Sequence, residues 1–303
     1  MRHISKSFPG VRALQDVDFT LCEGEIHALM GENGAGKSTL IKVLTGVYEK
    51  DEGEIMLKGH EKPVIIRSPQ DAQNLGISTV YQEITLCPNL SVAENMYIGR
   101  GKGIGQNWKE MNEKADKILT ALGIPAKAQQ QLSSCSIAIQ QMVAIARAVD
   151  MDCKVLILDE PTSSLDEQEV EKLFGLMRDL REKGVGIIFV THFLDQVYEV
   201  CDKITVLRDG TLVGEYEIKD LPRVKLVAKM LGKEMDDEAA IKEEALVYQG
   251  DESLPPVIEA EGLQSNAGIK PFDFYIRKGE VNGFTGLLGS GRSECVREIG
   301  RAH

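Results

Sequence analysis

The stretch at residues 31–39 reads Gly-Glu-Asn-Gly-Ala-Gly-Lys-Ser-Thr and follows an apolar run at residues 26–30. The run predicts a buried strand that enters a glycine-rich loop directly, and apolar residues at helical spacing from Leu40 onward predict a helix after the loop. The glycines let successive backbone N–H groups point into one concavity, toward which the helix directs its positive end. Phosphate is therefore expected there, with Lys37 reaching the β- and γ-phosphates and the Ser38 hydroxyl binding Mg²⁺. The alternative, a glycine-rich turn with a chance lysine, is disfavoured by this context.

The composition excludes several classes of protein. The 303 residues are 43% apolar, which allows a proper core, and the formal charge of -12 disfavours nucleic acid as the main partner. Six cysteines are scattered without a C-x-x-C pair, so neither a zinc site nor a disulfide framework is suggested. Without a signal peptide or a run of about eighteen apolar residues, the chain is expected neither to be exported nor to span a membrane, and any membrane role would come through a partner.

Phe8, just before the Pro9-Gly10 turn, has two open interpretations. It is placed to stack on an adenine ring bound near the phosphate loop, or it is a core phenylalanine. No strand is evident before this segment, which suggests that the recorded start is late.

Short elements are expected after the loop helix: strands at residues 55–57 and 77–81, with a polar helix at 69–75 between them. Gln82 directly follows the second strand and is either a polar cap or a contact to Mg²⁺ or the attacking water. Ser91 and Glu94 form a capping-box pattern that opens another helix. A glycine-rich loop at 101–109 and amphipathic helices at 109–123 and 136–149 complete a helical insertion over about residues 88–150.

A continuous apolar run at residues 155–158 is closed by Asp159 and Glu160. Such a run predicts a fully buried parallel strand that ends at the carboxyl edge of a sheet, where ligands of open α/β sheets bind. Asp159 would complete the Mg²⁺ shell through water, and Glu160 would accept a proton from the attacking water. Two acids that merely end a strand are the alternative.

The next segments continue the strand and helix alternation. Asp166 is expected to cap a helix over residues 167–183, with Glu169 in the reciprocal capping position. A second buried strand at 187–190 ends in Thr191-His192, so His192 is either structural or a γ-phosphate contact. A hairpin follows at residues 204–213. Together these elements predict a mixed α/β sheet with an antiparallel edge.

The composition turns acidic and polar toward Pro255-Pro256, which indicates a linker over residues 236–256 between a domain at 1–235 and a second segment at 257–303. The second segment repeats the order of features that leads to the first phosphate loop, and its own loop carries Arg292 in place of lysine. Guanidinium is bulkier than ammonium and fits such a cradle less well. We interpret residues 257–303 as the truncated start of a repeat of the first domain.

The order of these motifs resembles that of ABC-transporter ATPases over essentially the whole chain. Three phrases resemble the monosaccharide-importer subfamily of the ribose, galactose and arabinose type: Val-Tyr-Gln-Glu at 80–83, Pro-Asn-Leu-Ser-Val-Ala-Glu-Asn at 88–95 and Val-Leu-Arg-Asp-Gly at 206–210. The stretch at 189–198 is most similar to the galactofuranose branch. The resemblance implies an α/β P-loop NTPase fold of the ABC ATPase type, with a RecA-like core, an antiparallel β edge and a helical insertion.

The resemblance also implies roles for particular residues. It makes Glu160 the catalytic base, His192 the switch histidine, and Ser164–Asp166 the D-loop, and it assigns Ser38, Gln82 and Asp159 to Mg²⁺. Gln82 would also act beside Glu160 and His192 in catalysis. ATP would contact the aromatic ring of Phe8, the signature residue Ser136, Asp166 and the phosphate loop, which comprises Gly31, Glu32, Asn33, Gly34, Ala35, Gly36, Lys37, Ser38 and Thr39.

Two departures from the family pattern are expected to matter. The signature, usually Leu-Ser-Gly-Gly-Gln, falls at Cys135-Ser-Ile-Ala-Ile139, because a register at Leu132-Ser133 spoils the downstream spacing. In the head-to-tail pair that the family forms, this weak signature would face the loop with Arg292, so one site would be degenerate. The chain is then expected to bind Mg-ATP but to hydrolyse it poorly alone, unless a homodimer forms in which the weak signature of one copy completes the ATP site of the other.

The resemblance implies partners as well: integral membrane permease subunits, a second ATPase domain or a second copy, and indirectly a periplasmic sugar-binding protein, with no nucleic acid. It places the protein peripherally at the cytoplasmic face of the inner membrane. Two other classes stay open, a soluble ABC ATPase acting on ribosomes or DNA and a nucleotide-binding module without turnover. The sequence does not identify the sugar.

Overall fold

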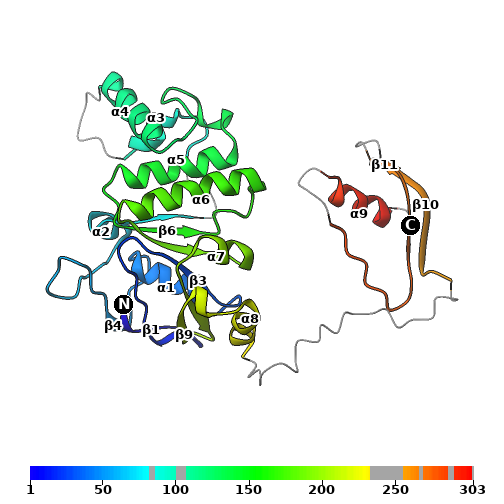
Figure 1. Cartoon of the computed structure of the whole chain (residues 1–303), viewed down its shortest axis with the longest axis horizontal. Coiled ribbons are helices and arrows are strands. Elements are labelled where there is room, and N and C mark those ends of the chain that lie inside the picture. Colours follow the sequence, from blue (N-terminus) through cyan, green and yellow to red (C-terminus); the bar gives the residue numbers. More distant parts are fainter. Residues whose placement is uncertain (82–85, 100–106, 233–254, 266–268, 286–289, 302–303) are drawn as a thin grey trace. The chain divides into compact units, whose positions relative to one another are not determined.

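The computed structural model describes residues 1–81, 86–99, 107–232, 255–265, 269–285 and 290–301. The chain divides into two compact units, Met1–Met235 and Asp236–His303 (Figure 1). We call them the first and the second unit and describe each by itself. Gln82 lies outside the described residues.

The first unit is built on a six-stranded sheet in the order β5-β6-β7-β3-β8-β9. The first five strands in this order, β5, β6, β7, β3 and β8, pair in parallel, and β9 pairs antiparallel to β8. The prediction of a mixed sheet with an antiparallel edge is confirmed. The strands are β3 (Ile26–Met30), β5 (Ile77–Val80), β6 (Val155–Asp159), β7 (Gly186–Val190), β8 (Lys203–Arg208) and β9 (Thr211–Glu217).

Helices cover both faces of this sheet, which explains why its central strands are continuous apolar runs. In β6, Leu156 and Leu158 belong to one apolar core and Ile157 to the other. The first core contains residues of α3, α4, α5 and α6, and the second contains residues of α1. The helices are α1 (Lys37–Leu44), α2 (Pro69–Asn74), α3 (Val92–Tyr97), α4 (Trp108–Ala121), α5 (Ile137–Val149), α6 (Glu167–Glu182), α7 (Leu194–Val200) and α8 (Arg223–Leu231).

The predicted helical insertion contains α3, α4 and α5, which pack on one another at the end of the unit opposite β1 and β9 (Figure 1). Both predicted capping boxes are present. Ser91 Oγ accepts from Glu94 N at 3.2 Å, and the Glu94 carboxylate accepts from Ser91 N at 2.7 Å. In α6, Asp166 Oδ1 accepts from Glu169 N at 2.8 Å. These caps satisfy N–H groups that the first helical turn leaves without partners.

No strand was predicted within residues 2–19, but the structure has two strands there. A three-stranded antiparallel sheet, in the order β2-β1-β4, contains β1 (Arg2–Phe8), β2 (Val11–Val17) and β4 (Glu52–Glu54). Only Ile4 of β1 is fully buried, so the strand lacks the apolar pattern by which a strand is recognised. The strand predicted at residues 55–57 lies three residues earlier as β4, because pairing with β1 rather than the apolar run defines it.

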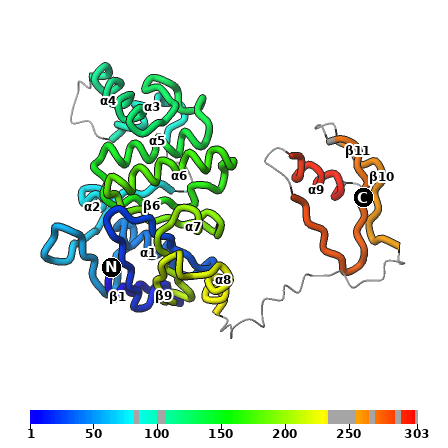
Figure 2. The backbone as a smooth tube through the Cα atoms, viewed as in Figure 1, coloured from blue at the N-terminus to red at the C-terminus, as the bar shows by residue number. Residues whose placement is uncertain are grey.

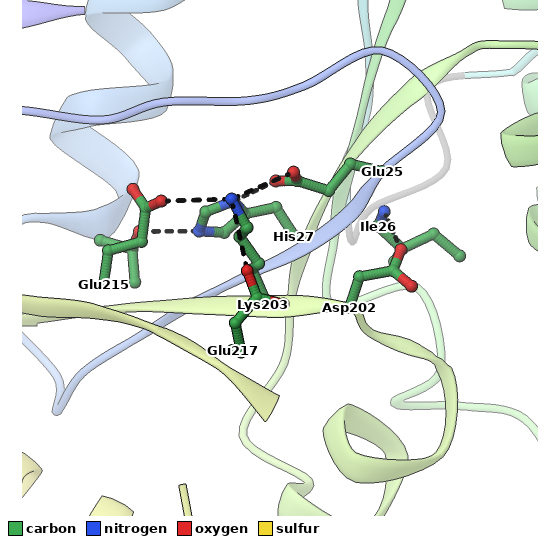
Figure 3. A network of polar contacts seen from close by, with 8 residues as sticks. Glu25, Ile26, His27, Asp202, Lys203, Glu215 and Glu217 are labelled. Atoms are coloured by element: carbon green, nitrogen blue, oxygen red, sulfur yellow. Dashed lines mark hydrogen bonds and ion pairs between the residues drawn. The ribbon is translucent and has the colours of Figure 1, made fainter. Parts of the chain in front are cut away.

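A polar network lies at the start of β3, the strand that leads into the phosphate loop (Figure 3). His27 is fully buried; its Nδ1 donates to Glu25 Oε1 at 2.7 Å, and its Nε2 lies 2.7 Å from Thr205 Oγ1 on β8. Lys203 Nζ lies 3.6 Å from the second Glu25 oxygen and 3.7 Å from carboxylates of Glu215 and Glu217 on β9. The network therefore ties the start of β3 to the start of β8 and to the end of the antiparallel strand β9.

The network predicts that the free energy of unfolding falls at low pH and that Glu25 contributes to this fall. Burial raises the pKa of this carboxyl, but the hydrogen bond from His27 and the proximity of Cys22 and Lys203 outweigh it, and the net pKa lies below its ordinary value. The stabilisation is therefore fully present above about pH 4.3 and is lost as the pH falls through the lowered pKa. Glu25→Gln is expected to reduce the free energy of unfolding at pH 7 by about 1–3 kcal/mol and to flatten its fall in acid.

Urea unfolding between pH 3 and pH 7 measures both effects. Glu23→Gln is the matched control, because Glu23 lies two residues earlier with its side chain 59% exposed, paired with Lys58 at the surface. Equal losses in the two variants would show that the buried network contributes nothing particular.

The second unit begins with an antiparallel hairpin of β10 (Ile258–Ser265) and β11 (Ile269–Ile276). A turn with Gly279 at φ 80° follows, and α9 (Arg292–Arg301) comes after it. The first unit shares the order of hairpin, glycine turn and helix: the β1–β2 hairpin, a turn with Gly24 at φ 65°, and α1. It also has the strand β3 before α1, whereas the described residues of the second unit have no strand between Gly279 and α9. In the described parts of both units, no helix has the length and apolar character needed to cross a membrane.

Candidate functional site

The phosphate loop follows β3 and turns through glycines that have positive φ. Gly31, Gly34 and Gly36 have φ of 151°, 85° and 106°. A Cβ at Gly31 would lie 2.3 Å from the carbonyl oxygen of Leu207, so a side chain at this position would push the loop off β8. A Cβ at Gly36 would similarly approach Ala13 O to 2.8 Å. The loop is therefore held by the ends of neighbouring strands, with glycine required where they touch it.

Lys37 is the first residue of α1, and its ammonium folds back over the loop. Nζ donates to Gly31 O at 2.6 Å and to Glu32 O at 3.0 Å. Burial lowers the pKa of Lys37, and the charges of Glu160 and Asp159 partly offset this effect. The ammonium therefore lies inside the loop, within electrostatic range of both acids that were predicted from the sequence.

The remaining loop residues differ in exposure. Ala35 is buried, and its carbonyl accepts from Gly210 N at 3.1 Å, which braces the loop against the β8–β9 turn. Thr39 is half-buried in α1. Four loop residues stay accessible to a ligand: Glu32, Asn33, Gly34 and Ser38.

Asp159 and Glu160 lie at the carboxyl end of β6. The amide of Glu160 donates to Val190 O at 2.9 Å, which extends the pairing with β7 by one step. Glu160 has φ 48°, a left-handed conformation that is uncommon for a residue with a side chain and that occurs preferentially at functional sites. Burial, and secondly the charge of Glu160, raise the pKa of Asp159. A nearby cation would relieve both effects on Asp159.

His192 follows β7, and its Nδ1 lies 3.5 Å from Glu160 Oε1. The loops after β6 and β7 are joined by a contact that sequence analysis missed. Gln196 Oε1, on α7, accepts from Thr162 Oγ1 at 2.6 Å and from Thr191 Oγ1 at 3.4 Å. This link holds the Glu160 loop beside the His192 loop; it joins residues 34 apart, so only the fold reveals it.

A cavity of about 830 Å³ brings these groups together. One part of its lining is polar and contains six of the residues predicted from the sequence: Gly31, Glu32, Asn33, Lys37, Glu160 and His192. Thr191 adds a further polar group, and the rest of the lining is apolar: Met30, Leu194, Val227, Met230 and Leu231. Asp159 does not line the cavity but acts electrostatically on Lys37.

Among the predicted site residues outside the phosphate loop and the acidic pair, Phe8, Ser136 and Asp166 do not line the cavity. Phe8 is half-buried, belongs to none of the apolar cores, and packs edge-on against Tyr48 with ring centroids 5.1 Å apart. Ser136 is exposed and caps α5, where its side chain accepts from Ile139 N at 3.4 Å. Asp166 is exposed and caps α6. The structure gives the last two a capping role within this chain.

A strand that leads into a glycine loop, a lysine within the loop, and an acidic pair that ends a parallel strand define a P-loop nucleotide-binding fold. The comparisons with known proteins define it further. Residues 14–163 match the family model described as "ABC transporter". Residues 14–163 are therefore an ABC transporter domain, and the α/β fold is that of the ABC ATPases.

Two relatives from bacteria show the similarity over 98% of this chain. A fructose import ATP-binding protein of Bifidobacterium longum is 51% identical, and a galactofuranose transporter ATP-binding protein of Escherichia coli is 52% identical. The chain spans 58% of the length of each relative.

Solved structures agree with the fold. The ADP conformation of an ATP-binding cassette of an ABC transporter aligns with a TM-score of 0.68 and 27% identity, covering 77% of this chain and 97% of that one. A dimeric, post-hydrolysis cassette bound to ADP and Pi aligns with a TM-score of 0.60 and 25% identity, covering 72% of this chain and 97% of that one.

Proposed function

We propose that the chain binds and hydrolyses ATP and energises the import of a monosaccharide through an ABC transporter. The observation that carries the proposal is the cavity shared by Lys37 and the Glu160–His192 pair. The names of the relatives, which are import ATP-binding proteins for fructose and galactofuranose, support the transport role.

The geometry supports a division of labour in hydrolysis. The ammonium of Lys37 and the N–H groups of the loop bind the terminal phosphates and stabilise the charge that develops on them. Water attacks the γ-phosphorus, the bond from that phosphorus to the β–γ bridging oxygen breaks, and Glu160 accepts the proton of the water. His192, 3.5 Å from the Glu160 carboxylate, contacts the γ-phosphate on the same side of the cavity.

The available donors fit Mg²⁺. The exposed hydroxyl of Ser38 and the carboxylate of Asp159 are hard oxygen donors, and Mg²⁺ in nucleotide sites typically takes one or two carboxylates together with phosphate oxygens and water. Gln82 would be a further ligand. The metal would neutralise charge on the β- and γ-phosphates and relieve the electrostatic cause of the raised pKa of Asp159.

We further propose that residues 236–256 link the first domain to the start of a second ATPase domain at 257–303. The shared order of hairpin, glycine turn and helix supports this, and Arg292 begins α9 as Lys37 begins α1. A loop with Arg292 is the weaker phosphate site, so the competent site around Lys37 would act with a second ATPase domain or a second copy. The partners would be membrane permease subunits at the cytoplasmic face of the inner membrane and, through them, a periplasmic sugar-binding protein.

Co-purification tests the transport assignment. We expect the chain to co-purify from membranes with a multi-spanning protein, and co-purification with ribosomes instead would favour the soluble class.

A nucleotide-binding module without turnover is the second candidate function. It is favoured by the weak signature, because Ala138 and Ile139 occupy the first turn of α5 where the family pattern has glycine and glutamine. Single-turnover measurement separates it from the first, because a module would retain bound ATP unchanged.

A further inference from the structure

Helix α8 (Arg223–Leu231) lies beside the phosphate loop, although no sequence motif assigned it to the site. Leu226 is fully buried and belongs to an apolar cluster with Met30, the last residue of β3, and with Val206 of β8. Tyr198 of α7 donates through its hydroxyl to Leu221 O at 2.6 Å, and Arg223 lies over the Tyr198 ring. Figure 2 shows α7 and α8 together on one side of the first unit.

The C-terminal turn of α8 is fastened to the same strand end that supports the phosphate loop. Arg208, the last residue of β8, donates through Nη1 to Lys229 O at 3.2 Å, and Gly232 ends the helix with φ 69°. The preceding residue, Leu207, has the carbonyl oxygen on which Gly31 packs. The end of β8 thus contacts both α8 and the phosphate loop, and it holds the helix at a defined position beside the loop.

One exposed face of α8 is apolar. Val224, Val227 and Leu231 are 38%, 38% and 48% exposed and lie at positions i, i+3 and i+7 of one helix face. Two of them, Val227 and Leu231, line the cavity together with Met230, whereas Val224 does not. This face is unusual because it borders a cavity whose other wall has Lys37, Glu160 and His192.

The cavity corresponds to the phosphate end of a nucleotide site. Its polar lining contains the first three residues of the phosphate loop, Lys37 and the acid–histidine pair, and it does not contain Phe8, the residue predicted to meet adenine. A nucleotide with its phosphates on the loop would therefore direct its terminal phosphate into the space that α8 closes on the opposite side.

We propose that α8 is a wall of the nucleotide site at the terminal phosphate, and that Val227 is a residue by which this wall distinguishes ATP from ADP. The inference rests on the proposed ATP-binding function. An aliphatic wall gives the anion no hydrogen bonds, and it replaces water next to the phosphate, so that charges in the cavity act across a less polar medium. A charge placed on this wall should then be felt more strongly by a γ-phosphate than by a nucleotide that lacks one.

Calorimetric titration of the whole chain with Mg-ATP and with Mg-ADP tests the proposal in Val227→Asp, with Val224→Asp as the matched control. The two valines lie on one face of one helix at equal exposure, and only Val227 lines the cavity. Val227→Asp is expected to weaken ATP binding about five-fold or more and ADP binding about two-fold or less. Val224→Asp is expected to leave the ratio of ATP to ADP affinity unchanged.

Equal ATP to ADP ratios in the unmodified chain and both aspartate variants would overturn the proposal. Val227→Lys provides a second variant in case the aspartate impairs folding: its ratio should shift toward ATP relative to Val224→Lys, and no shift would count against the wall. The unmodified chain separates the two levels of the argument. If it bound no ATP, the proposed function itself would fail. If it bound ATP tightly and the Val227 variants did not change the ratio of ATP to ADP affinity, only the proposal for α8 would fail.

Discussion

Glu160→Gln is expected to lower ATP turnover about a hundredfold or more while leaving Mg-ATP binding nearly intact, the usual scale for removal of a general base. Glutamine keeps the size of the side chain but accepts no proton, and the backbone bond to Val190 O that holds this position does not involve the side chain. Phosphate release under multiple-turnover conditions measures the loss, and calorimetry measures the retained binding.

A carboxylate outside the cavity gives a control for this prediction. Glu169→Gln alters a carboxylate in the α6 capping box, outside the cavity, and should cost stability rather than turnover. Unchanged phosphate release in Glu160→Gln would remove Glu160 from the role of base. A loss of nucleotide binding equal to the loss of turnover would instead make it a binding residue.

Lys37→Met is the second substitution with a large expected effect, a loss of about a hundredfold in ATP affinity. The ammonium lies inside the loop at 2.6 Å from Gly31 O, and charge-assisted hydrogen bonds to phosphate are worth about 1.5–3 kcal/mol each. Methionine preserves most of the aliphatic stem, so the loss reports the charge rather than the packing. Calorimetric titration with Mg-ATP provides the measurement.

Lys42→Met on the same helix is the matched variant, because Lys42 Nζ lies over the Tyr48 ring, 5.3 Å from its centroid, and does not line the cavity. Lys42 is half-buried, and its charge acts on Asp159 only as a minor effect. We expect the ATP affinity of this variant to stay within about twofold of the unmodified chain, since a charge outside the cavity is screened from the phosphates. Similar losses in both variants would mean that general charge, not the loop lysine, attracts the nucleotide.

The parts of the fold that could be predicted are those in which local pattern and burial agree. Strands β6 and β7 are continuous apolar runs because helices cover both faces of the sheet. The acids that close the first run, and the threonine and histidine that follow the second, mark the carboxyl edge of the sheet. Strand β1 could not be predicted because a single residue, Ile4, is fully buried in it. Its pairing with β2 and with β4, which lies far along the chain, stabilises it instead.

The site was predictable only where a local sequence motif determines the local backbone conformation. The loop with Lys37 and the pair at Glu160 and His192 come from separate segments, and they meet because three parallel strands end at one edge. The link through Gln196 and the wall formed by α8 have no local pattern, since both depend on contacts between segments that the fold brings together. The apolar residues of α8 would be assigned to a core by sequence alone.

The central claim is that a triphosphate is held between the loop lysine and the acidic pair. A crystal structure of the chain with Mg²⁺ and a non-hydrolysable ATP analogue tests it most directly. The account predicts a terminal-phosphate oxygen about 2.7–3.2 Å from Lys37 Nζ, with Glu160 and His192 facing the same phosphate. A nucleotide bound elsewhere, with Lys37 still donating to the carbonyl groups of Gly31 and Glu32, would contradict it.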